Sequence, residues 1–320
     1  MGMGIRFMAL IAGILLFFPA DFRGKSEGEK INQSVYILKI IDHGALNETA
    51  RGVRDSLIGK SVKIAEESAQ GNPSLALQIA QKISGQRPTV VVAIGTVAAQ
   101  SFMRHMGGEY GPNVLIFSSI TNPGAAGLTQ HRRVGGVSNF IPIEPQLALF
   151  KRIQPSLKKL GILYNPGEAN SQEIVKILRN ICGKFQIKLV EQVALKTSEI
   201  PQAAAKLANS ADAIFISNDN TALAAIRSVI KMANRKKIPV YVSDTDAVEL
   251  GALAALGPNQ YQIGLQTGRM VNGVLSGDLG EDLPMEQAES MELHINLSAA
   301  RLLGIVIGDP ILAEAKRIYQ

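Results

Sequence analysis

The sequence has no tryptophan, one cysteine and few aromatic residues, which make up 5% of its 320 residues. A single cysteine excludes an intrachain disulfide, and Cys182 lies in a helical pattern where we expect it to face inward as an inert thiol. The four histidines are far apart and have no H-x-x-H or C-x-x-C partner, so no zinc site is indicated. The apolar fraction is mainly aliphatic, which is typical of buried parallel strands covered by helices.

No strong charge imbalance is present. The formal net charge of +6 is modest for this length, and the basic residues are scattered apart from short clusters such as "NRKKIP" at 234–239. Such a cluster is usually a solvated helix end, and we expect no nucleic-acid partner.

One apolar run stands out, from Phe7 to Ala20, after an early positive charge at Arg6. The run is short for a transmembrane helix and has the length of a signal-peptide core, so residues 1–30 are predicted to be a signal peptide and linker. Export to the periplasm or the extracellular space follows. The cleavage point stays open, an uncleaved anchor is the alternative, and lipid attachment is not expected because no cysteine follows the run. No later segment is apolar for long enough to span a bilayer.

Beyond residue 33, strand-like segments alternate with helical patterns. In the first half the strands are predicted at 34–41, 61–68, 89–95 and 113–119, and the helices at 45–59, 73–84 and from Thr96 onward. In the second half the strands are predicted at 158–165, 188–195, 212–217 and 238–243, and the helices at 168–182, 199–210 and about 219–234. This α/β alternation predicts parallel sheets with helices on both faces, and its repetition predicts two similar doubly wound lobes.

The last part of the chain adds a strand at 251–257, a helix at 259–277, and a strand with a short helix at 290–304. These elements complete both lobes if the chain crosses between them near 140–144, 257–259 and 282–289. The predicted first lobe is therefore 31–142 plus 258–284, and the second is 143–257 plus 285–320.

Six loops that follow strands are rich in Ser, Thr, Asn, Asp and Gly. They are residues 43–47, 95–100, 118–127, 164–171, 217–221 and 243–248. In open parallel sheets ligands bind at the carboxyl ends of strands, beside helix N-termini. Helix capping by Thr96, Asp219 and Asp244 is the alternative for single loops. Six such loops from both halves favour a shared cleft.

Catalytic and cofactor motifs are missing. The sequence has no G-x-S-x-G and no G-x-G-x-x-G, and "GVRDSLIGKS" (52–61) has Arg54 where a phosphate-binding loop needs glycine. "SNDNT" (217–221) lacks the alternating oxygen ligands of a calcium loop. We therefore expect neither an enzyme nor a bound cofactor or metal.

Several motifs together resemble one family. They are "HGALNETARGVRDSL", "VVVAIGTVAAQSF", "VLIFSSITNPGAAGL", "YNPGEANS", "ADAIFISNDNT" and "GALAALGPNQYQIGLQTGRM". In this order they resemble ABC-transporter substrate-binding proteins of the tryptophan- or tyrosine-uptake type, over the chain from Ser34 to about Gly304. The resemblance implies a type I periplasmic-binding-protein fold, with two lobes joined by a three-strand hinge that closes on a small polar ligand. It also implies an ABC permease as partner.

Strand-end position and this resemblance together suggest ligand contacts for nine residues. Thr96 and Ala98 would offer hydroxyl and backbone N–H groups to a ligand carboxylate, and Asp244 would pair with an ammonium. Asn220 would hydrogen bond the ligand, whereas Asp219 and Thr221 would hold the start of a helix. Further contacts are expected from Ser119, Thr121, Asn122, Tyr164 and Asn170.

Among the departures of this chain from the family pattern, two replace an acid by an amide, at Asn47 and Asn122. If either acid normally receives a ligand ammonium, the ligand of this chain differs. Three other functions compete with a transport receptor: a ligand-sensing partner of a membrane receptor, the effector domain of a repressor, and an enzyme. The repressor would need an N-terminal helix-turn-helix, in place of which this chain has the export-like segment.

Overall fold

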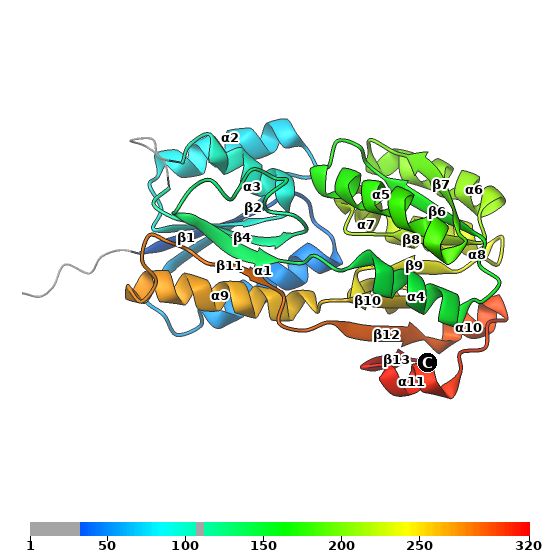
Figure 1. The fold of residues 1–320 in the computed structure, drawn as a ribbon. Coiled ribbons are helices and arrows are strands. Elements are labelled where there is room, and N and C mark those ends of the chain that lie inside the picture. The colour runs from blue at the N-terminus through cyan, green and yellow to red at the C-terminus, as the bar shows by residue number, and fades with distance from the viewer. Residues whose placement is uncertain (1–32, 107–111) are drawn as a thin grey trace, which may run out of the picture. The chain divides into compact units, whose positions relative to one another are not determined.

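A computed structural model describes residues 33–106 and 112–320, and Gln33–Gln320 forms one compact unit. The predicted signal peptide and linker lie outside the described residues. Within the described ranges no helix is long and apolar enough to cross a membrane. The chain builds two α/β lobes, each around its own sheet (Figure 1).

The first lobe contains a fully parallel six-stranded sheet in the order β11-β5-β4-β3-β1-β2. Its strands are β1 (Ser34–Lys39), β2 (Lys63–Ser68), β3 (Val90–Ile94), β4 (Leu115–Ile120), β5 (Val134–Ser138) and β11 (Met285–Gln287). Its helices are α1 (Gly44–Ser56), α2 (Pro73–Gly85), α3 (Thr96–Met103) and α9 (Gln260–Ser276). Helices α1 and α9 pack together, as do α2 and α3, and the two pairs cover opposite faces of the sheet (Figure 1).

The second lobe contains a seven-stranded sheet in the order β13-β12-β10-β9-β8-β6-β7, in which β10 and β12 are antiparallel. Its strands are β6 (Lys159–Tyr164), β7 (Lys188–Val193), β8 (Ala213–Ile216), β9 (Val240–Val242), β10 (Ala254–Gly257), β12 (Glu292–Asn296) and β13 (Arg317–Tyr319). Its α-helices are α4 (Ile143–Ile153), α5 (Ala169–Ile181), α6 (Ile200–Ser210), α7 (Asn220–Ala224), α8 (Ile226–Asn234), α10 (Leu297–Leu303) and α11 (Asp309–Glu314). Short 3-10 turns are η1 (Cys182–Phe185), η2 (Thr197–Glu199) and η3 (Thr245–Val248).

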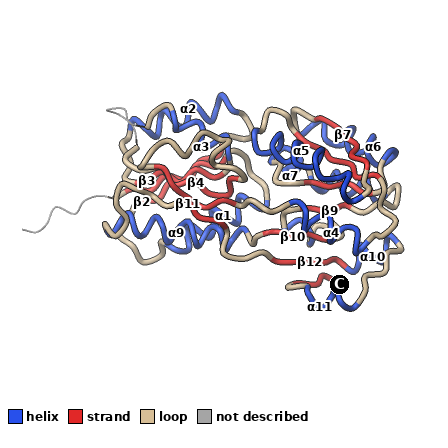
Figure 2. The backbone as a smooth tube through the Cα atoms, viewed as in Figure 1, coloured by secondary structure: helices blue, strands red, loops and turns tan. Residues whose placement is uncertain are grey.

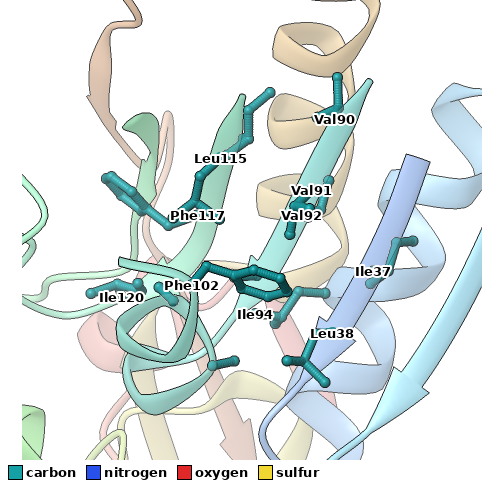
Figure 3. Packing of buried hydrophobic residues seen from close by; sticks show 14 of the residues in the cluster. Ile37, Leu38, Val90, Val91, Val92, Ile94, Phe102, Leu115, Phe117 and Ile120 are labelled. Atoms are coloured by element: carbon teal, nitrogen blue, oxygen red, sulfur yellow. The ribbon is translucent and has the colours of Figure 1, made fainter. Parts of the chain in front are cut away.

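Continuous apolar strands explain why both sheets are covered on two faces. All five residues of β3 are buried, and Figure 3 shows Val91, Val92 and Ile94 packed with Phe102 and Leu115. In the second lobe alternate residues of β6 face different cores, because successive side chains of a strand point to opposite sides. Leu160 and Ile162 pack with the α4 and α5 side, whereas Leu163 packs with the α6 and α8 side.

The predicted alternation is confirmed for every strand and helix named from the first half, with ends that shift by no more than three residues. The predicted helix at about 219–234 is wrong in its continuity, because the chain breaks at Ala225 (φ −113°, ψ 19°) into α7 and α8. The pattern missed β5, whose sequence VGGVS has two glycines in place of β-branched residues. It also missed α4, α11 and the short strands β11 and β13.

The chain passes between the lobes three times, as the tube in Figure 2 shows. The crossings lie between β5 and α4, between β10 and α9, and between β11 and β12. The predicted domain boundary at 284/285 differs from this arrangement, because residues 285–287 pair with β5 in the first sheet. This strand is three residues long, too short for a periodicity signal.

Candidate interlobe ligand site

The two lobes meet through two hydrogen bonds between polar strand-end residues. His43, which directly precedes α1 in the first lobe, contacts Asn220 of the second lobe with 3.2 Å between Nε2 and Oδ1. Asn218 Nδ2 donates to the Asn139 carbonyl oxygen at 3.2 Å, at the first crossing. The predicted shared cleft therefore corresponds to a region where strand ends of both sheets come together.

The Asn220 amide has a fixed orientation, which also fixes the state of His43. Asn220 Nδ2 donates to Glu168 Oε2 at 2.7 Å, so Oδ1 is the atom that faces His43. An amide oxygen only accepts, so His43 Nε2 carries the proton and Nδ1 is left as an acceptor. Burial lowers the pKa of His43 to about 4, and its Nδ1 is buried without a hydrogen-bond partner among the described residues.

Asp219 holds the start of α7, as the sequence predicted. Its Oδ1 accepts from Ala222 N at 2.7 Å, which is the N-cap hydrogen bond. Its Oδ2 accepts from Asn165 N at 2.7 Å and from Ser171 Oγ at 2.6 Å. Burial, and then the charge of Glu168, raise the pKa of Asp219 to about 7.

Glu168 is a residue that the sequence reasoning missed, although it lies within the motif "YNPGEANS". Its carboxylate accepts from the backbone N–H groups of Asn220 and Thr221 at 3.0 Å, and from the Thr221 hydroxyl at 2.8 Å. Two carboxylates, Glu168 and Asp219, therefore share the first turn of α7. They position Asn220 from both sides.

A chain of amides connects two predicted site residues across the lobes. Thr121 Oγ1 is 3.4 Å from Asn139 Oδ1, Asn139 accepts from Asn218, and the Asn218 carbonyl accepts from Asn170 Nδ2 at 2.7 Å. Asn170 Oδ1 is buried without a partner within the described ranges, so it is a free acceptor in this region. Asn139 and Asn218 were not predicted, because the spacing of 79 residues between them gives no sequence signal.

Ser119 lies at the end of β4 with a left-handed backbone (φ 54°), where the register with β5 shifts. Its hydroxyl donates to Gln260 Oε1 at 2.9 Å and lies 3.0 Å from Thr49 Oγ1. The side chain therefore binds α1 and α9 of its own lobe. A non-glycine residue with positive φ persists only where surrounding contacts hold it, and such residues are frequent at functional sites.

Thr96 and Ala98 are buried in the first turn of α3. The alternative that Thr96 caps this helix is wrong, because the N-cap is Gly95, with φ 93° and no capping side chain. The first backbone hydrogen bond of the helix runs from Ala99 N to the Gly95 carbonyl oxygen. The N–H groups before Ala99 therefore remain available to an anion at this end.

The side chain of Tyr164 is held by partners within the second lobe, although Tyr164 also lines a cavity of about 530 Å³ with Ala125 of the first lobe. Its hydroxyl donates to Glu191 Oε2 at 3.1 Å, on the neighbouring strand β7, and Glu191 is paired with Arg179. Its ring packs in the core of the second lobe. The structure does not bring this side chain to His43 and Asn220.

The amides that replace family acids have structural partners. Asn47 Oδ1 accepts from Lys39 Nζ at 2.7 Å, and Lys39 also pairs with Asp42 and Glu66. Asn122 Oδ1 accepts from Ala125 N at 3.0 Å within its own turn. Neither amide donates or accepts across the lobes, so these two substitutions give no indication of a changed ligand.

Asp244 lies in a cavity of about 370 Å³ between the lobes, lined also by His43, Glu48, Asp246 and Arg317. Asp244 is 4% exposed, and within the described ranges its carboxylate has one hydrogen bond, from Asp246 N at 3.2 Å. That bond caps η3, which was the alternative role considered for Asp244. Burial, and then the charge of Asp246, raise the pKa of Asp244 to about 7. Among the residues that the structure describes, Asp246 Oδ2 is also buried without a partner, so unsatisfied acceptors gather in this cavity.

A second cavity, of about 230 Å³, lies on the Asn220 side of the same contact. Its apolar wall is formed by Ile40, Ile41, Val97 and Leu195, and its polar groups include Asn165, Glu168, Asn220 and Thr221. Because His43 lines one cavity and Asn220 the other, their hydrogen bond lies where the two cavities adjoin.

Metal and thiol chemistry have no basis in the described part of the chain. No group of three acidic, histidine or cysteine side chains there is suited to hold a metal ion. Cys182 is buried as predicted, and burial raises the pKa of its thiol to about 11.

A family model described as ABC transporter substrate binding protein matches residues 34–319. The chain belongs to this family. It is therefore a substrate-binding protein of the type I fold that binds a small molecule, and it is not an enzyme.

Three relatives show the extent of the similarity. A tyrosine-binding protein of Clostridioides difficile is 28% identical over 298 residues, which cover 89% of this chain and 84% of that protein. The crystal structure of a conserved domain protein from Vibrio cholerae is 36% identical with a TM-score of 0.85, and covers 90% of this chain and 99% of that one. An ABC domain from Streptococcus pneumonia in complex with L-Trp is 28% identical with a TM-score of 0.83 and the same coverage.

Proposed function

We propose that this substrate-binding protein is an exported receptor that binds an amino acid between its lobes and delivers it to an ABC permease. The observation that carries the proposal is Asp244, a buried carboxylate with a single hydrogen bond beside the free acceptor His43 Nδ1. A buried charge is costly unless it is paired. A ligand ammonium would supply the missing donors to both atoms.

The other end of the ligand is assigned to the start of α3. The N–H groups of Thr96 and Ala98 and the Thr96 hydroxyl would receive the carboxylate, since helix N-termini favour anions. Asn220 would exchange its hydrogen bond with His43 for one with the ligand. The family relatives named for tyrosine and crystallised with L-Trp support an amino acid as ligand.

Closure of the lobes would complete these contacts. Asp244 and Asn220 belong to the second lobe, whereas Thr96, Ala98 and His43 belong to the first. A ligand that contacts both lobes binds the closed state more strongly and shifts the population toward it. Thr121 and Asn170, which the chain of amides connects across the lobes, would be further ligand contacts, as would Asn122 in the turn after β4. Ser119 would act through Gln260 and Thr49.

The ligand can be found by stripping bound solute through unfolding and refolding, and then screening amino acids by thermal shift. A ligand in excess raises the melting temperature by mass action. The Asp244→Ala variant should lose more than tenfold in affinity for an ammonium-bearing ligand, which corresponds to about 1.5–3 kcal/mol for a charged hydrogen bond. The exposed Asp278→Ala change is the matched control. Unchanged affinity of Asp244→Ala would remove this residue from the site.

An uptake assay distinguishes a role of this protein in transport from a role in sensing. Cells that carry the candidate permease should accumulate labelled ligand only when this protein is present. Normal accumulation without it, together with ligand binding in the screen, would favour a sensing role.

A further inference from the structure

Exposed basic residues gather at one edge of the second sheet, where its strands begin. Lys158 directly precedes β6, and Lys159 is its first residue. Lys184 lies in η1, and Lys188 is the first residue of β7. Three further basic residues, at 235–237, precede β9. We call this set the basic edge, and it consists of Lys158, Lys159, Lys184, Lys188, Arg235, Lys236 and Lys237, all exposed. It includes the cluster "NRKKIP", which the sequence alone presents as a solvated helix end.

Backbone pairing shows that these segments are neighbours in space. Lys159 and Lys188 are directly opposite in the β6–β7 register, and Lys188 N donates to the Lys158 carbonyl oxygen at 2.7 Å. On the other side of β6, Asp212 N donates to the Lys159 carbonyl oxygen at 2.8 Å. Between β8 and β9, Ile214 N donates to the carbonyl oxygen of Pro239, and Pro239 is two residues after Lys237. Since adjacent strands are about 4.8 Å apart, the edge spans only about 15 Å.

The basic edge has almost no counter-charge of its own. Within the described ranges none of its seven cations forms an ion pair with a carboxylate. Asp212 is the one acid in these strand-start segments, and its Oδ2 accepts from the backbone N–H groups of Lys158 and Lys159 at 2.9 and 2.7 Å. Seven cations and this acid leave six positive charges, as many as the formal net charge of the whole chain.

The corresponding edge of the first sheet is different. There Arg132 and Arg133, just before β5, pair with Asp282 and Glu281 respectively. That edge also carries Lys60 and Lys63, before and at the start of β2, which form no ion pair within the described ranges. It is therefore neutralised in part, whereas no cation of the basic edge is paired with a carboxylate.

We propose that the basic edge rests on an anionic lipid surface. Clusters of basic residues are attracted to anionic bilayers, and the attraction acts within about a Debye length of the surface. A protein partner fits less well, because interface cores are enriched in aromatic residues and arginine and depleted of lysine. Six of the seven cations here are lysines, and Phe185 is the one aromatic residue among these segments.

The position of the edge suits this role. In a parallel sheet the strand starts are at the opposite end from the carboxyl ends that form the ligand site. Contact through the basic edge therefore leaves His43, Asn220 and Asp244 accessible. The inference does not depend on which ligand the site binds.

The test is co-sedimentation of the full chain with vesicles of phosphatidylcholine, with and without about one-third phosphatidylglycerol. We expect binding to the anionic vesicles that is at least tenfold stronger than to neutral ones and is lost as salt rises. Replacing four cations by glutamine (Lys158→Gln, Lys188→Gln, Arg235→Gln and Lys236→Gln) should lower binding at least tenfold, since each basic residue near the surface contributes about fivefold.

The matched control removes the same charge elsewhere, through Lys60→Gln, Lys63→Gln, Lys176→Gln and Lys196→Gln, which are exposed and unpaired with carboxylates within the described ranges. This variant should keep at least half of the binding. An equal loss in both variants would mean that net charge alone acts, and would overturn the proposal. So would unchanged vesicle binding by the basic-edge variant, which would leave the edge to an acidic protein or polymer. The melting temperature without added ligand should be the same in all three proteins, which shows that they are folded.

Discussion

His43 and Asn220 are 177 residues apart in sequence and join the two lobes by a buried hydrogen bond of 3.2 Å. Each residue follows a strand of its own sheet, and each lines a different cavity at the boundary. Glu168 fixes the Asn220 amide, so the same contact fixes the protonated nitrogen of His43. The bond therefore joins the two lobes and, at the same time, determines which nitrogen of His43 is left as an acceptor in the candidate site.

We expect His43→Ala to weaken closure of the ligand-free protein. One hydrogen bond contributes about 0.5–1.5 kcal/mol, so the open-to-closed ratio should rise about 2- to 12-fold. Small-angle X-ray scattering would show a larger radius of gyration for the variant without ligand. His131→Ala, at an exposed position, is the control, and equal radii in all three proteins would contradict the role of the bond.

Ligand affinity should fall with acidification below about pH 7. Burial and Asp246 raise the pKa of Asp244 to about 7, so the free protein holds a proton there at lower pH and must release it to bind an ammonium. The expected slope is about tenfold per pH unit between pH 5 and 7. His43 does not contribute, because its pKa is lowered to about 4.

Asp244→Asn tests the origin of this slope. The variant should bind weakly and with little pH dependence, although Asp219 still titrates near pH 7. Calorimetric titration from pH 5 to 8 measures both proteins. A variant that keeps the full slope would assign it to Asp219 instead.

Substitutions at Asp219 and at Asn220 should differ in their effects, the first mainly on stability and the second mainly on ligand affinity. Asp219→Ala removes three hydrogen bonds, to Ala222 N, Asn165 N and Ser171 Oγ, and should lower the free energy of unfolding by about 2–4 kcal/mol with little change in affinity. Asn220→Ala should reduce affinity more than tenfold at a smaller loss of stability. Urea unfolding and calorimetric titration of both variants measure the two effects, and the reverse pattern would exchange the two roles.

Helices α1 and α9 should be intolerant of any added atom at their contact. A Cβ at Gly264 would lie 2.2 Å from the Thr49 carbonyl oxygen and 2.9 Å from Gly52 Cα. Gly264→Ala should therefore lower the free energy of unfolding by about 2–3 kcal/mol, because backbone cannot yield as a side chain does. Gly85→Ala, in α2 with no atom within 4 Å, should be neutral or stabilise by about 0.5–1 kcal/mol. Equal midpoints in urea for the two variants would contradict this packing argument.

Periodicity and capping residues predicted most of the fold. The runs of Val and Ile at β1, β3 and β4 identified strands because both faces of the sheet are covered, and Asp219 was recognised as a cap because of its position before an apolar helical pattern. The same reasoning failed at β5, where glycines replace branched residues, and it did not identify Gly95 as the N-cap of α3. It also failed at Ala225, where the chain turns within a continuous helical pattern.

The sequence predicted which residues lie near the candidate site better than it predicted which side chains they contact. Strand-end loops indicated Asn220 and Asp244, and the structure places both at the lobe boundary. Glu168 and Asn139 were missed because their partners lie 52 and 79 residues away. Tyr164 was predicted at a strand end, but its side chain turns toward β7, a choice that depends on the neighbouring strand.

The sequence by itself determined the α/β alternation, the division into two lobes and the caps, because each depends on residues within one turn or one strand. Tertiary structure decided which strand ends meet, and with them the state of His43, the shared first turn of α7 and the basic edge of the second sheet. These features depend on strand order and register, which bring together side chains that no local pattern connects.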